Sequence, residues 1–365
     1  VKIRKKLINK NDPDIADALN YLALTLRRQN RLEDAIQVHN EVLTMMGNII
    51  ATNPGQISEL SRRSALYRAR AYQTKGQELL SKGLKSKGSL WSASALLEKK
   101  YHQLVIDSHL NFINAGADVI VTNNFSARRV RMLENKVNDK FQYANIKAGE
   151  LAVKAREFSK KNIKIAGSLP AQNDTYINDN RDYNIIHKGF TDQAICLKPY
   201  IDFYYLDVMS SIRECQIGLS VTSKMNLPAL VGLHVKSDGK LPSGESISQI
   251  AEEYKKYNIL GVILSCVSPE IIEKVSDELS KFNIPYGYKA NLWEINEPLP
   301  HTAWIKKPNQ IGTNPIEVLG SRNDYTDEMF LNFSKKMIRM GATIIGGCCE
   351  IKPKHIKKIS NLSNK

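Results

Sequence analysis

Residues 260–290 read LGVILSCVSPEIIEKVSDELSKFNIPYGYKA, which is an apolar run, a helical stretch and a second apolar run. The runs Leu260–Val267 and Ile284–Ala290 are short and carry little polar alternation, as is typical of strands covered on both faces of a parallel sheet. Glu270–Phe282 between them has the spacing of an amphipathic helix. The same alternation repeats along the chain, with further apolar runs at Ala117–Thr122, Ile163–Leu169, Asp202–Met209, Ala229–Val235 and Ala342–Cys348.

Seven such strands separated by helices are one short of a (β/α)8 barrel. The predicted fold class is therefore α/β, a (β/α)8 TIM barrel whose first strand is atypical or missing. An open doubly wound sheet is the alternative, but no G-x-G-x-x-G follows any of the apolar runs. The missing strand belongs just before Gln77, where Ala65–Tyr72 either serves as a substitute strand or leaves the barrel open with unpaired edges.

The sequence before the barrel is helical in its periodicity from about residue 14 to residue 76. Leu19, Leu22, Ala23 and Leu26 form an i, i+3, i+4, i+7 stripe, and a second amphipathic run follows. This pair resembles a tetratricopeptide repeat, and one and a half repeats cannot bury their own apolar faces. We therefore predict a tetratricopeptide-like helical segment over residues 1–75, a barrel over 76–365, and a surface for a protein partner within residues 14–75.

The charge of the chain is strongly basic, with 52 Lys and Arg against 37 Asp and Glu and a formal net charge of +15. The excess is spread along the chain, and no helix-turn-helix, RNA-recognition or zinc-finger pattern occurs, so we expect a solvated lysine-rich surface and no nucleic-acid partner. No run of 18 apolar residues occurs, which predicts no membrane span. Val1–Lys10 lacks the apolar core of a secretory signal, so the expected location is cytoplasmic.

Three of the five cysteines end predicted strands. Cys266 ends the sixth strand, and Cys348 and Cys349 end the eighth, behind Gly346-Gly347. In a (β/α)8 barrel these ends form the active-site face, so the three sulfurs can converge on one Zn²⁺ with a fourth position open. The alternatives are small buried hydrophobic side chains or a Cys348–Cys349 disulfide, and the first of these is our interpretation of the other two cysteines, Cys196 and Cys215.

A zinc ion with three thiolates carries a net charge of −1, which makes it a poor Lewis acid for a carbonyl group. It suits a substrate thiol in the open position, because the thiol loses its proton there and stays electron-rich. The pattern therefore indicates alkylation of a thiol rather than hydrolysis.

Several motifs of this chain, in this order, resemble those of the zinc-dependent homocysteine S-methyltransferases over residues of about 76–360. They are Leu90-Trp91-Ser92-Ala93, Ala115–Asn123, Ala166–Pro170, Asp238–Gly244, Gly261–Cys266, and Gly346-Gly347-Cys348-Cys349 with Pro353–Ile356. The resemblance implies a (β/α)8 fold, one Zn²⁺ held by the three strand-end cysteines, and methyl transfer from a methyl-onium compound or a methylated cofactor to homocysteine, which gives methionine.

The resemblance also implies substrate-binding residues. Asp207 stands where the family commonly has a Glu that holds the homocysteine amino group, and Glu214 matches a second acidic position. Glu214 is equally well read as a carboxylate stabilised by a helix N-terminus. Thr122 matches a substrate-contacting position. Trp91 resembles an aromatic wall near the substrate, with plain loop packing as the alternative.

The start of the barrel departs from the family, which opens with a strand ending in Asp-Gly-Gly. Here Tyr72-Gln73-Thr74-Lys75 precedes Gly76, so Tyr72 replaces an acidic substrate ligand. Three hypotheses follow: a homocysteine methyltransferase that is active or impaired, the same chemistry on another acceptor such as a selenocysteine-derived thiol, or a non-catalytic scaffold protein that binds a partner through its N-terminal helices.

Overall fold

The computed structural model describes residues 82–253, 256–281, 284–303 and 315–364, together with 69–70, 79–80, Leu19, Asp34 and Val38. The chain divides into two compact units, Val1–Ser64 and Ala65–Lys365. Nearly all of the predicted tetratricopeptide-like segment, and Tyr72 with it, lies outside the described residues. That segment, its partner surface and the boundary between residues 75 and 76 therefore stay predictions.

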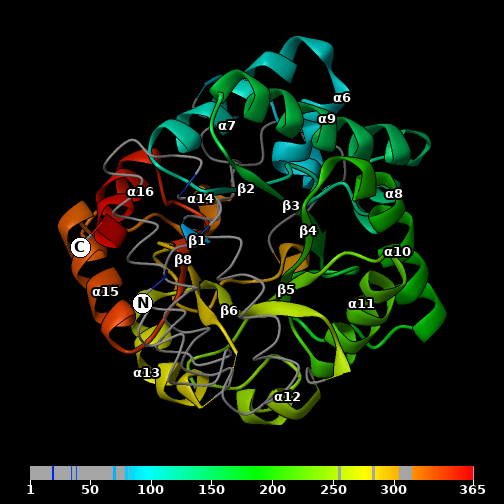
Figure 1. Ribbon diagram of the computed structural model, residues 1–365. Helices are drawn as coiled ribbons and strands as arrows, with labels where there is room; N and C mark the ends of the chain where they lie inside the picture. The colour runs from blue at the N-terminus through cyan, green and yellow to red at the C-terminus, as the bar shows by residue number, and fades with distance from the viewer. Residues whose placement is uncertain are drawn as a thin grey trace. The chain divides into compact units, whose positions relative to one another are not determined.

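The second unit is built on a parallel sheet with the strand order β1-β8-β7-β6-β5-β4-β3-β2. Figure 1 shows the strands as an inner layer surrounded by helices. The strands are β1 (Ala69–Arg70), β2 (Val119–Val121), β3 (Lys164–Pro170), β4 (Phe203–Met209), β5 (Ala229–Leu233), β6 (Ile259–Val267), β7 (Tyr286–Ala290) and β8 (Ile344–Gly347). The strands β2–β8 correspond one by one to the seven predicted apolar runs.

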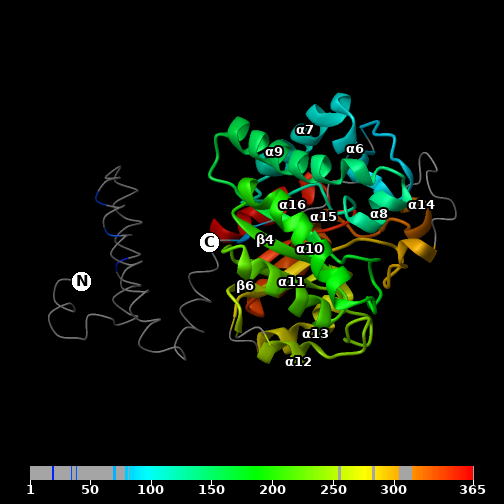
Figure 2. The same cartoon turned by 90° about the vertical axis from the view of Figure 1, so that its right-hand side faces the viewer.

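Helices alternate with the strands and cover the outside of the sheet, as α10 and α11 do beside β4 in Figure 2. The helices are α6 (Ser94–Leu97), α7 (His102–Asn114), α8 (Arg129–Glu134), α9 (Phe141–Ser159), α10 (Tyr183–Leu197), α11 (Ile212–Lys224), α12 (Ile247–Glu253), α13 (Pro269–Ser280), α14 (Ile316–Leu319), α15 (Asp327–Arg339) and α16 (Pro353–Ser360). Side-chain caps start three of them, because Asp182, Ser211 and Thr326 each accept a hydrogen bond from the first turn of α10, α11 and α15.

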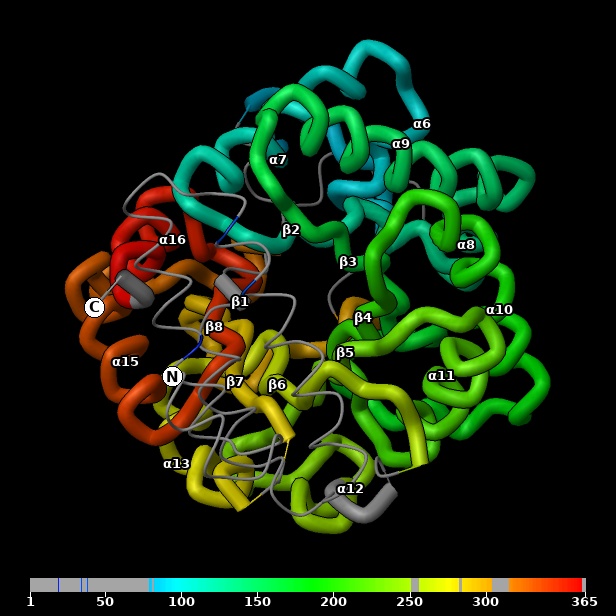
Figure 3. Tube along the Cα trace, in the orientation of Figure 1, coloured from blue at the N-terminus to red at the C-terminus, as the bar shows by residue number. Residues whose placement is uncertain are grey.

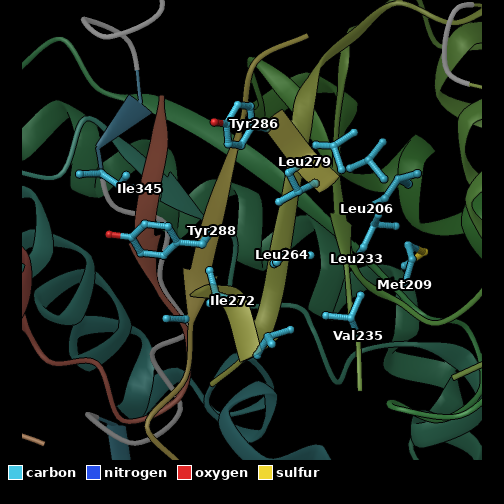
Figure 4. Close-up of a cluster of buried hydrophobic side chains, with 14 of the residues drawn as sticks. Leu206, Met209, Leu233, Val235, Leu264, Ile272, Leu279, Tyr286, Tyr288 and Ile345 are labelled. Carbon is cyan, nitrogen blue, oxygen red and sulfur yellow. The ribbon is translucent and has the colours of Figure 1, made fainter. Parts of the chain in front are cut away.

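The strands are apolar on both faces because each face packs against a different layer. Leu206, Leu233 and Leu264 lie in a cluster with Ile272 and Leu279 of α13 (Figure 4). The alternate positions form a second buried cluster inside the sheet, which contains Val121, Ala166, Tyr205, Leu230, Ile263 and Ile344. This explains the near-absence of polar alternation in the sequence. Within the described residues, no helix is long and apolar enough to cross a membrane.

The sheet departs from a closed barrel at β1. This two-residue strand lies within Ala65–Tyr72 and pairs with β8, with Ala69 opposite Ile344 and Arg70 opposite Ile345. On its other side β8 lies beside β7, and β7 lies beside β6 (Figure 3). In the part of the chain that the structure describes, β2 pairs only with β3. The seven strands β2–β8 therefore make a curled half-barrel sheet. The predicted substitute strand, β1, adds only one short pairing, at the edge of this sheet formed by β8.

The close approach of β7 and β8 can be tested by a substitution at Gly287 in β7. A Cβ at this position would lie directly against the backbone carbonyl of Ile344, which a change of side-chain rotamer cannot relieve. We expect Gly287→Ala to lower the free energy of unfolding by about 3 kcal/mol, measured by urea denaturation. The exposed Lys335→Ala is the control and should change stability by less than about 0.5 kcal/mol. Equal stability of the two variants would contradict the close approach.

Candidate metal centre

Three cysteines from two segments meet at the carboxyl ends of the strands. Cys266 lies near the end of β6, and Cys348 and Cys349 directly follow β8, so both sites flank β7. The Sγ atom of Cys349 is 3.8 Å from that of Cys266 and 3.8 Å from that of Cys348. All three sulfurs lie within 4.8 Å of one another, and all three side chains are buried.

The backbone around the cysteines is held in an unusual form. Cys266 has a φ of 57°, in the left-handed region that side chains other than glycine rarely adopt. The Asn291 side chain donates to the Cys266 carbonyl at 2.7 Å. The Cys348 amide donates to Ala290 at 2.6 Å, and the Cys349 carbonyl accepts from Leu292 at 3.0 Å. Residues 290–292, at the end of β7 and directly after it, therefore hold the backbone of Cys266 and the backbone of Cys348 and Cys349 in place.

The three thiols do not ionise alike. Burial by itself would raise the pKa of Cys266, but hydrogen bonds from the Cys348, Cys349 and Tyr176 side chains hold that pKa well below its ordinary value. Burial raises the pKa of Cys348 to about 12. Without an ion, the cluster therefore favours one thiolate that is stabilised by neighbouring S–H and O–H donors.

The donor set fits Zn²⁺. A tetrahedral ion with Zn–S bonds of about 2.3 Å separates its sulfur ligands by about 3.8 Å. Cys349 Sγ lies at this distance from the sulfurs of both Cys266 and Cys348. Soft thiolates select zinc over magnesium or manganese. Three ligands leave one tetrahedral position open.

Aromatic side chains pack in the same cluster as the sulfurs. Val208, Trp293 and Leu319 share a buried cluster with the three cysteines, and Trp91, Phe125 and Tyr176 pack against it. Among the described residues, neither the Trp91 nor the Trp293 indole N–H has a hydrogen-bond partner. Trp91, which the sequence suggested as an aromatic wall near the substrate, packs against the cluster that contains the cysteines, and its contact with a substrate stays a prediction. Sequence reasoning missed Phe125, Tyr176 and Trp293, since loop residues give no periodic signal.

Asp207 lies inside the sheet close to the cysteines and forms a buried ion pair. The Lys289 ammonium on β7 is 2.8 Å from Asp207 Oδ1, and both side chains are at most 1% exposed. Ser168 and Ser265 donate to the same carboxylate at 3.2 and 3.3 Å. Burial opposes the charged form of Lys289, but the Asp207 carboxylate raises the pKa of Lys289 above its usual range. Sequence reasoning missed Lys289, although a lone cation in an apolar run was a signal for a buried partner.

The other two predicted substrate residues are engaged within the protein. Thr122 Oγ1 donates to Asn124 at 2.6 Å and accepts from the Ser168 amide at 3.0 Å. Glu214, in the first turn of α11, accepts from the amides of Gln172 at 3.2 Å and Ser210 at 3.3 Å. Burial raises the pKa of Glu214 to about 7 despite these two bonds. Neither residue belongs to the buried cluster that contains the cysteines.

A parallel α/β sheet with three buried thiols at the carboxyl ends of its strands has the arrangement of an enzyme active site. The family model for homocysteine S-methyltransferase matches residues 73–363, and the chain belongs to this family. Homocysteine S-methyltransferase 1 from Arabidopsis thaliana is 26% identical over 304 residues, which cover 74% of this chain and 86% of the relative. The chain is therefore a methyltransferase.

Other relatives vary in the acceptor that their names give. Selenocysteine methyltransferase from Astragalus bisulcatus is 23% identical over 322 residues, which cover 78% of this chain and 89% of the relative. Among solved structures, the metallated form of the homocysteine methyltransferase MmuM from Escherichia coli matches with a TM-score of 0.65 at 16% identity. The match covers 81% of this chain and 96% of MmuM, and it shows the shared fold.

The buried pair makes a prediction for stability. Lys289→Met leaves the Asp207 carboxylate buried without its cation, so we expect a loss of about 3–5 kcal/mol in the free energy of unfolding. Combining it with Asp207→Asn removes the stranded charge, and the double variant should be more stable than Lys289→Met alone. Denaturation of all four proteins measures the coupling, and additive effects would show that the two groups do not interact.

Glu214 makes a prediction for pH dependence. Its pKa of about 7 in the folded protein exceeds the ordinary 4.5, so the folded state holds the proton more tightly than the unfolded state. This residue's contribution to stability is therefore fully present below pH 4.5 and is lost as pH rises through 7, by roughly 3 kcal/mol. We expect Glu214→Gln to gain stability relative to wild type between pH 5 and pH 8. A stability difference that stays constant over this range would contradict the raised pKa.

Proposed function

We propose that this chain transfers a methyl group from a methyl-onium donor to the thiol of homocysteine and forms methionine, with a Zn²⁺ held by Cys266, Cys348 and Cys349. The observation that carries the proposal is the cluster of three buried sulfurs within 4.8 Å at the carboxyl ends of the strands. Membership of the homocysteine S-methyltransferase family supports the acceptor and the reaction class.

The cysteines determine what the metal can do. Zinc bound by three thiolates would lower the pKa of a substrate thiol in its open position and keep the sulfur electron-rich. Such a site has a net charge of −1, so it favours a positively charged donor over a neutral or anionic one. This agrees with methyl-onium compounds, whose positive charge disappears when the methyl group leaves.

The aromatic residues supply the second half of the site. Trp293 belongs to the buried cluster that contains the sulfurs, and Trp91, Phe125 and Tyr176 pack against it. The faces of such rings attract cations. A sulfonium or quaternary ammonium donor would gain this attraction and would also shield the thiol from water. The free indole N–H groups of Trp91 and Trp293 could donate to a carboxylate of either substrate.

We propose that Asp207 binds the amino group of homocysteine, and that Thr122, Glu214 and Trp91 are further substrate-binding residues. Asp207 Oδ1 already binds Lys289 Nζ at 2.8 Å. A substrate ammonium would therefore compete with Lys289 for this carboxylate. This predicts weaker binding of homocysteine than a free carboxylate would give, and it keeps other small thiols open as acceptors.

Metal analysis and a donor panel test the proposal together. Purified protein should contain about one zinc per chain, and homocysteine should be methylated by at least one of S-methylmethionine, S-adenosylmethionine, betaine and a sulfonium osmolyte. Cys348→Ala should lose both the zinc and at least 100-fold in rate, because one of three ligands is gone. Cys196→Ala is the matched control and should retain both.

The outcomes separate the competing hypotheses. Folded protein that binds no zinc would overturn the metal proposal. Zinc-loaded protein that methylates none of the tested thiols would favour the scaffold hypothesis, which would then be examined by partner capture with and without residues 14–75. Competition between homocysteine and selenocysteine in one assay decides the acceptor.

A further inference from the structure

Tyr176 contacts one of the three cysteines directly. Its hydroxyl oxygen is 3.2 Å from Cys266 Sγ, although Tyr176 lies after β3 and Cys266 lies on β6. The backbone of Tyr176 has a φ of 71°, in the left-handed region. Such a conformation persists only where the surrounding structure holds it in place.

The loop that carries Tyr176 is fixed on two sides. Asp174, two residues earlier, binds Arg131 Nη2 at 2.9 Å, His301 Nδ1 at 2.6 Å and Thr302 Oγ1 at 2.8 Å. The Tyr176 ring packs on His234 at the end of β5, with ring centroids 4.7 Å apart. Contacts from three segments, namely α8, the turn at His301–Ala303 and the end of β5, thus hold the phenol of Tyr176 against the sulfur of Cys266.

The proposed chemistry creates a need for such a contact. A donor that methylates a substrate thiolate can also react with the thiolates that hold the metal. In that side reaction a new S–C bond would form on Cys266, the bond between the methyl carbon and the onium atom would break, and its electron pair would leave with the neutral donor product. Cys266 would become an uncharged thioether and a poorer ligand.

A hydrogen bond to the ligand sulfur opposes this reaction. A zinc-bound thiolate has no proton, so the Tyr176 hydroxyl must be the donor in this contact. The bond draws electron density from the sulfur and lowers its nucleophilicity. The Asn291 side chain, 3.7 Å from the same sulfur, adds a second donor.

We propose that Tyr176 is a specificity-determining residue that keeps methylation off Cys266 and directs it to the substrate thiol. The proposal rests on the zinc and onium chemistry proposed above. It assigns Tyr176 a role that plain packing of the ring would not provide, because only the hydroxyl is needed for it.

The test uses the zinc-loaded 365-residue chain and methyl iodide, so that the natural donor need not be known. Wild type, Tyr176→Phe and Tyr288→Phe are treated for a series of times, and peptide mass spectrometry measures methyl-Cys266 relative to methyl-Cys348. Tyr288→Phe is the matched control, because it removes a buried hydroxyl that binds Ser334 in the outer core. Zinc content is measured on each sample before treatment.

We expect the ratio of methyl-Cys266 to methyl-Cys348 to rise about fivefold to tenfold in Tyr176→Phe and to stay at the wild-type value in Tyr288→Phe. Tyr176→His, which keeps an N–H donor, should give an intermediate ratio and serves also if the Phe variant does not fold. An unchanged ratio in folded, zinc-loaded Tyr176→Phe or Tyr176→His would overturn the proposal. Because this readout needs no turnover, protein that shows the shift but methylates no thiol would instead overturn the proposed function alone.

Discussion

The buried ion pair between Asp207 and Lys289 connects strands of the sheet near the ends where the three cysteines lie. Asp207 accepts from Ser168 on β3, Ser265 on β6 and Lys289 on β7, so one carboxylate connects four strands. Charges this deep are stable only when each one is paired and its remaining hydrogen-bonding capacity is used. The sulfur of Cys266, one residue beyond Ser265, takes its position from this layer.

Unfavourable backbone conformations are concentrated around the three cysteines, next to this ion pair. Trp91, Tyr176, Val208, Cys266 and Glu350 all have positive φ values, and each belongs to or adjoins the cluster around the sulfurs. A β-branched residue such as Val208 rarely adopts this conformation. The sheet and its helices therefore compensate for a set of unfavourable local backbone conformations at the site. This is the usual relation between a rigid scaffold and a functional site.

The sequence was most informative where chemistry and periodicity coincide. The seven apolar runs and the three strand-end cysteines could be read directly, because burial on both faces removes polar alternation and because thiols are rare. Lys289 could not be matched to Asp207, since that pair spans 82 positions and depends on strand register. The position of Tyr176 could not be found either, because it depends on contacts with Cys266 and His234, which lie 90 and 58 positions away in the sequence. The β1–β8 pairing involves only two residues of β1, and a strand of two residues is too short to give a periodic pattern in the sequence.

The division of the three clustered cysteines between two distant segments has a consequence for the order of events during synthesis. Cys348 and Cys349 are adjacent, but two neighbouring sulfurs hold zinc far less tightly than three, and Cys266 precedes them by most of two strand–helix repeats. A growing chain therefore cannot assemble the centre on the ribosome until its eighth strand has been translated. A metal that needs all three sulfurs would therefore be bound late, after all eight strands of the sheet have been synthesised.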